Sequence, residues 1–136
     1  MKRIVVFVLI VSFVTMGLCL HADSATRTKV EVLYMNHGPL MDTLSKMKNL
    51  FSRYGNKISV SWYDFETAEG EQFMAKQGIR QHVPLVVWID GSAVVTAGGK
   101  RVRLEGFPTG SGPALFQGKW TLDDLKAALD QLTTGK

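Results

Sequence analysis

The stretch VEVLYMNHGPL, residues 30–40, decides the fold together with GIRQHVPLVVWI, residues 78–89. Apolar side chains occupy both faces of residues 30–35, which is typical of a central strand covered on both sides. This strand leads directly into His37-Gly38-Pro39-Leu40, where the proline suits the first turn of a helix. In the second stretch, Gly78 can end a helix, and a proline stands directly before an apolar strand. The two stretches therefore predict two strands, each next to a helix.

Hydrophobic periodicity predicts the remaining elements. We expect helices at about 39–54, 68–77 and 122–132, the last with a capping box formed by Thr121 and Asp124. Strands are expected at 58–63, 85–89, 93–97 and 101–105. The first strand–helix–strand unit predicts a parallel strand pair. Of the segments 93–97 and 101–105, one is expected to be the last core strand and the other an extra hairpin arm.

The two quoted stretches resemble the thioredoxin-like family, in which Cys-Gly-Pro-Cys closes the first strand and a cis-proline opens the third. The resemblance covers about residues 29–133. It implies an α/β fold in the minimal βαβαββα order, with a four-stranded mixed sheet and an extra hairpin arm. The domain would span residues 30–133, after a polar lead at 23–29. Its cis-proline would be Pro84, and His37 and Leu40 stand where the family has its two cysteines.

Redox chemistry is not expected of this domain. The only cysteine of the chain is Cys19, which lies before the domain. Disulfide exchange requires a thiolate, and an imidazole or a leucine cannot replace it. A dithiol–disulfide oxidoreductase and a thiolate metal site are both excluded. The domain is expected to act by binding rather than by catalysis, without a cofactor, and an enzyme or metal handler that uses His37 and His82 is the alternative.

The N-terminal segment predicts export. Lys2 and Arg3 precede an uncharged, mainly apolar run over residues 4–20, which is the pattern of a secretory signal. Cleavage after Ala22, or less favourably after Ala25, would remove it. A retained membrane anchor through residues 4–20 is the other interpretation. Whether residues 1–22 are a cleaved signal or a retained anchor, they are separate from the folded domain. The domain is expected in the periplasm or otherwise outside the cytoplasm.

The resemblance also implies a binding groove. In the family, the residue before the cis-proline presents its backbone to an extended peptide, and here that residue is Val83. The expected partner is therefore a protein or peptide of the cell envelope. Alternatively, the proline is needed only for its turn. The expected groove residues are His37, Gly38, Pro39, Leu40, Val83, Pro84 and Phe107.

Two other functions stay open. His37 and His82, with Met35 and Met41 nearby, would suit copper because soft ligands select Cu(I). Some relatives of this fold handle copper, but with cysteines and a histidine. Methionines at this density are also common core filler, so the two histidines are weak metal candidates. A third hypothesis is a structural subunit that docks through the predicted hairpin and the loop at 107–119.

Charge and aromatic residues give weaker indications. The formal net charge is +4, which is mild, and export argues against a nucleic-acid partner. Arg101 and Arg103 would share one face of a strand whose edge is guarded by charge. In the glycine- and proline-rich loop, Phe107, Phe116 and Trp120 are expected to pack against the body of the domain, or to form a partner patch where they are exposed.

An acidic cluster occurs near the start of the second predicted helix. Acidic residues at a helix N-terminus are favoured by the helix dipole, which accounts for the cluster without a calcium site. Its members are Asp64, Glu66, Glu69 and Glu71.

Overall fold

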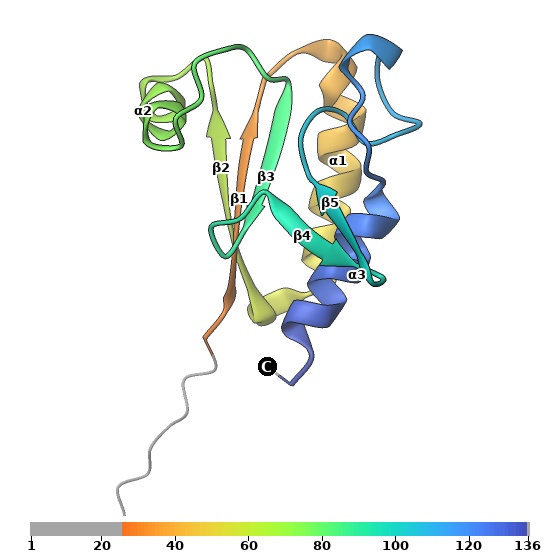
Figure 1. The fold of residues 1–136 in the computed structure, drawn as a ribbon. Coiled ribbons are helices and arrows are strands. Elements are labelled where there is room, and N and C mark those ends of the chain that lie inside the picture. Colours follow the sequence, from red (N-terminus) through yellow and green to blue (C-terminus); the bar gives the residue numbers. More distant parts are fainter. Residues whose placement is uncertain (1–25, 136) are drawn as a thin grey trace, which may run out of the picture.

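The computed structural model describes residues 26–135. The expected signal or anchor at 1–22 lies outside the described residues. Three helices, five strands and two single turns of 3-10 helix make up the fold (Figure 1). In chain order these are β1 (Thr28–Tyr34), α1 (Gly38–Ser52), η1 (Gly55–Lys57), β2 (Ile58–Asp64), α2 (Ala68–Lys76), β3 (Leu85–Ile89), β4 (Val94–Ala97), β5 (Lys100–Arg103), η2 (Ala114–Phe116) and α3 (Leu122–Thr133).

The strands form two small sheets. In the first sheet the order is β2-β1-β3, with β1 parallel to β2 and antiparallel to β3. The parallel pair predicted from the strand–helix–strand unit is confirmed. β4 and β5 form a separate antiparallel hairpin, so both 93–97 and 101–105 contribute to the hairpin.

The prediction of one four-stranded sheet was wrong. The chain does reach β3 after the hairpin: the Leu104 carbonyl accepts from the Val87 N–H at 2.9 Å, and the Gly106 N–H donates to the Leu85 carbonyl at 2.8 Å. However, the Leu104 N–H is bonded to the Ala93 carbonyl at 2.8 Å. Gly106 then turns the chain away with φ +79°. The contact with β3 is therefore too short to be a fourth strand.

The first sheet separates a large core from a small one. α1, α3 and the β4–β5 hairpin cover one face, and α2 lies toward the other face (Figure 1). On the α2 side, Phe73 stacks on Tyr63 with ring centroids 3.9 Å apart and meets the edge of Trp88 at 5.3 Å. The large core contains the buried apolar residues of α1 and α3 together with Val95, Ala97 and Val102 of the hairpin. Most of the buried apolar surface, and hence most of the hydrophobic stabilisation, lies on the α1 side.

The predicted capping box of the last helix is confirmed. The Thr121 hydroxyl accepts from the Asp124 N–H, and the Asp124 carboxylate accepts from the Thr121 N–H at 2.9 Å. Lys100 of β5 donates to the same carboxylate at 2.9 Å. This bond is the main reason why the pKa of Asp124 lies below its ordinary value. The start of α3 is therefore tied both to its own backbone and to the hairpin.

No helix within residues 26–135 has the length and apolar character needed to cross a membrane.

Candidate functional site

An apolar groove lies where the quoted sequence motifs meet. β1 ends, α1 begins and β3 begins at this end of the molecule, and the loop after the hairpin lies at the same end (Figure 1). The hollow between them has a volume of about 280 Å³. Its lining consists of Met35, His37, Pro39, Leu40, His82, Pro84, Phe107, Pro113 and Phe116. We call this set the apolar groove.

Five of the seven predicted groove residues line the apolar groove, namely His37, Pro39, Leu40, Pro84 and Phe107. Gly38 does not; it is the first residue of α1. Val83 lines a different hollow, because successive side chains of an extended chain point to opposite sides. Pro113 and Phe116 were not predicted as groove residues. The aromatic residues of their loop were the only signal in the sequence.

The groove has a buried floor and an exposed rim. Leu40 and Phe107 form the floor and are only 1% and 4% exposed. Four large apolar side chains are well exposed within residues 26–135. One of them, Phe116, lines the groove, whereas Leu115 and Met41 are only sequence neighbours of the lining residues Phe116 and Leu40. Phe107 and Trp120 pack into the body as expected, whereas Phe116 is half exposed.

The two histidines have separate neighbours, although both line the groove. Nε2 of His37 lies 3.3 Å from Oε1 of Glu66. The His82 ring lies edge-on to Phe65, with centroids 5.0 Å apart. No group of three or more His, Cys, Asp or Glu side chains suited to a metal occurs in the described part of the chain. A copper site would therefore depend on the thioether of Met35 as a third ligand, and the two histidines stay weak metal candidates.

One wall of the groove, the loop 107–120, is held by many hydrogen bonds. Phe107 exchanges backbone hydrogen bonds with Phe116 and Gly118 at 2.8 and 2.7 Å. The Trp120 indole N–H donates to two carbonyls, those of Glu105 and Gly106, at 3.1 and 3.2 Å. The Ser111 hydroxyl is bonded to Thr43 of α1, and the Gln117 side chain bonds Gly110 and Gly112. We call this loop the fixed wall.

Another wall of the groove is formed by the segment 80–83, of which His82 lines the groove, and this segment has far fewer contacts. Within residues 26–135, the backbone groups of Arg80, Gln81, His82 and Val83 make no hydrogen bond. The neighbouring segments are bonded: the Ile79 N–H donates to the Met74 carbonyl at 3.0 Å. We call residues 80–83 the open wall.

The prediction that Pro84 follows a cis peptide bond was wrong, because the described residues contain no cis bond. The Pro84 carbonyl, directly before β3, accepts from the Met35 N–H, directly after β1, at 3.0 Å. The trans form is favoured intrinsically, by about 0.5–1 kcal/mol. The turn before β3 is therefore made without the family's characteristic bond.

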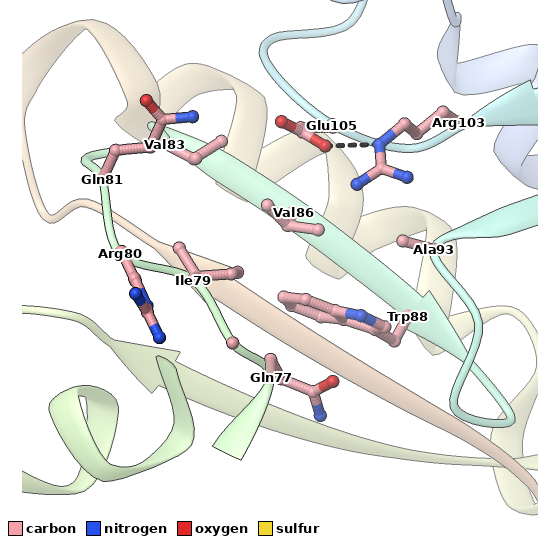
Figure 2. Close-up of a pocket in the computed structure, with 11 residues that line it drawn as sticks. Gln77, Ile79, Arg80, Gln81, Val83, Val86, Trp88, Ala93, Arg103 and Glu105 are labelled. Carbon is pink, nitrogen blue, oxygen red and sulfur yellow. Dashed lines mark hydrogen bonds and ion pairs between the residues drawn. The ribbon is translucent and has the colours of Figure 1, made fainter. Parts of the chain in front are cut away.

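A second hollow, of about 420 Å³, lies beside the small core (Figure 2). Val86 and Trp88 of β3 form its floor, and Val83 points into it from the open wall. Its rim carries the ion pair between Arg103 and Glu105. The open wall therefore separates two hollows, one apolar and one with a charged rim.

The chain was compared with protein-family models, curated proteins and solved structures, and none of the three comparisons found a match.

The lining of the apolar groove consists mainly of apolar side chains, together with the imidazoles of His37 and His82. Its charge is therefore low and its surface is easily desolvated, which favours contact with apolar side chains.

Proposed function

We propose that the domain is a cysteine-free member of the thioredoxin-like class that binds an extended, apolar segment of an envelope protein in the apolar groove. The observation that carries this proposal is that one groove has both an exposed apolar side chain and unbonded backbone. Phe116 is 51% exposed at the rim, and residues 80–83 of the open wall have no backbone partner in the described part of the chain.

These two features suit an extended segment for different reasons. Unbonded amides and carbonyls can pair with the backbone of an added strand, which supplies affinity. Alternate side chains of that strand then enter a pocket, which supplies selectivity. The groove volume of about 280 Å³ is at the lower end of small-ligand pockets, which suits one or two apolar side chains.

The envelope location rests on the basic and apolar residues at the start of the chain. Lys2, Arg3 and the apolar run at 4–20 have the pattern of an export signal or anchor.

The test is photocrosslinking in the native cells with a probe that replaces Phe116. The control is the same probe at Leu132, which is also exposed but lies at the far end of α3. We expect a discrete adduct from position 116 and none from position 132. Mass spectrometry of the adduct would identify the partner. Equal labelling from both positions, or none from position 116, would contradict the proposal.

A second candidate, a Cu(I) site, is favoured only by the presence of His37, His82 and Met35 in one groove. We expect no tight binding, because His37 already faces Glu66 and a soft-ligand site normally includes thiolates. A competition titration with a Cu(I) chelator decides this. Stoichiometric binding that is lost in His37→Ala would favour the copper function.

A further inference from the structure

The β4–β5 hairpin has a fixed hydrogen-bond register. Its strands are joined by Gly98 and Gly99, with φ +54° and +83°, and Ala97 pairs with Lys100. A two-residue turn with both φ angles positive closes on a hydrogen-bonded pair. The next hydrogen-bonded pair in this alternation is Val95 with Val102.

The backbone groups of Arg101 and Arg103 therefore point away from β4. In an antiparallel ladder, residues between the hydrogen-bonded pairs direct their N–H and C=O to the other side. The bond from the Leu104 N–H to the Ala93 carbonyl at 2.8 Å continues the same register and confirms the alternation. No strand pairs with this outer edge of β5 within residues 26–135.

A basic hollow of about 430 Å³ is lined by residues of this free edge. Arg101, Arg103 and Glu105 line it from the hairpin side, and Lys119 lines it from the fixed wall. Nε of Arg103 is paired with Glu105 at 2.5 Å. In the described part of the chain, neither Arg101 nor Lys119 has an ion-pair partner. The edge therefore combines unbonded backbone with uncompensated positive charge.

We propose that the outer edge of β5 binds an acidic segment in extended conformation, which adds to the hairpin as a third strand. Added strands gain affinity through backbone pairing and selectivity through alternate side chains. Arg101 and Arg103 lie two residues apart and share one face of β5, and both are exposed. The segment would thus carry acidic side chains at every second position.

A second copy of the chain does not fit this edge. Pairing of two β5 strands around a twofold axis would place arginines near arginines, and like charges on opposite strands are destabilising. The basic residues thus protect the edge from self-association, and the same charges attract an acidic strand. This inference does not rest on the proposed function, because the lining of the apolar groove includes none of these residues.

The test uses the full chain in nonionic detergent and a fluorescent peptide of six residues in which glutamate and valine alternate. Two further peptides are N-methylated, one on the glutamate amides and one on the valine amides. Charge and composition are then matched, but only one peptide keeps the amides that face β5. We expect the two dissociation constants to differ by about tenfold or more, because at least two hydrogen bonds are lost.

Charge reversal supplies the second arm of the test. We expect Arg101→Glu to weaken binding of the unmodified peptide by about fivefold. The control is Arg53→Glu, which makes the same change at the exposed C-terminal end of α1. No binding of the unmodified peptide, equal affinity of the two N-methylated peptides, or equal loss in the two protein variants would each overturn the proposal.

Discussion

The two walls of the apolar groove are built in opposite ways. The fixed wall has the buried Trp120 at its end and hydrogen bonds to its own backbone, to Gln117 and to α1. The open wall has no backbone hydrogen bond from Arg80 to Val83 within the described residues. Segments with few hydrogen bonds open at low free-energy cost. The comparison indicates that the fixed wall keeps a constant shape, whereas the open wall can change conformation at low free-energy cost.

The largest expected effect comes from removing the anchor of the fixed wall. Trp120 is 1% exposed, and replacing a buried tryptophan with alanine costs about 3–5 kcal/mol. We expect Trp120→Ala to lower the free energy of unfolding by about this amount, measured by urea denaturation. The matched control is Phe116→Ala on the same wall, which should cost less than about 1 kcal/mol because its side chain is half exposed.

Gly118→Ala tests how tightly the fixed wall meets the body. A Cβ at Gly118 would lie 1.9 Å from the Glu105 carbonyl oxygen, so the backbone must shift. We expect a loss of about 1–3 kcal/mol, the usual cost of overpacking. Gly38→Ala is the control, because a Cβ at Gly38 would meet no atom within 4 Å. A similar loss of stability in both variants, again by urea denaturation, would contradict the close approach at Gly118.

Asp124 lies in the first turn of α3, the helix that follows the fixed wall, and it links this helix to Lys100 of the hairpin. Its pKa is lowered below 3.8, first by the bond from Lys100 and then by those from Thr121. Its contribution to stability is therefore complete above about pH 4 and is lost as the pH falls through the lowered pKa. We expect Asp124→Asn to cost about 1 kcal/mol at pH 7 and to weaken the pH dependence below pH 4.

The measurement is the free energy of unfolding, by urea denaturation from pH 2 to 7, of the unmodified protein and of Asp124→Asn. Asp123→Asn is the control, since Asp123 is also in the first turn of α3 but makes no ion pair within residues 26–135. If the stability of Asp124→Asn falls below pH 4 as steeply as that of the unmodified protein, the Asp124 carboxylate does not contribute to the pH dependence of stability.

The last test changes no residue and involves the smallest free energies. We expect the amides of residues 80–83 to exchange with deuterium close to the unprotected rate, because their opening free energy is near zero. The amides of Phe107 and Gly118, which are bonded at 2.8 and 2.7 Å, should exchange far more slowly. Hydrogen exchange followed by NMR measures both walls in one sample. Equal protection of the amides in the two walls would contradict the difference in hydrogen bonding between the fixed wall and the open wall.

Sequence patterns located the helices well because their signals are local. Leu40, Leu44, Met47 and Phe51 recur at helical spacing and are all buried on α1, and Thr121 with Asp124 forms the predicted cap. The sheet was less predictable. Pairing passes from β4 to β3 at Leu104, whose N–H donates to the Ala93 carbonyl and whose own carbonyl accepts from the Val87 N–H. Pairing between distant segments has no signature within the window of a few residues that periodicity covers.

The candidate site was predicted in part for the same reason. His37, Pro39, Leu40 and Pro84 were identified because they belong to recognisable motifs. For Phe116 two alternatives were open, packing into the body or exposure in a partner patch. It lies half exposed at the rim, and the conformation of the loop determines this. The isomer of the bond before Pro84 likewise depends on tertiary contacts rather than on the local sequence.

The direction of β1 has a consequence for how the domain would be presented. β1 begins at Thr28 and runs for seven residues, which is about 23 Å at about 3.3 Å per residue. Its far end leads to Met35 in the apolar groove. A tether attached before Thr28 would therefore hold the domain by its base and direct the groove away from the point of attachment. Access to the groove would then be independent of whether the residues before β1 are cleaved or kept.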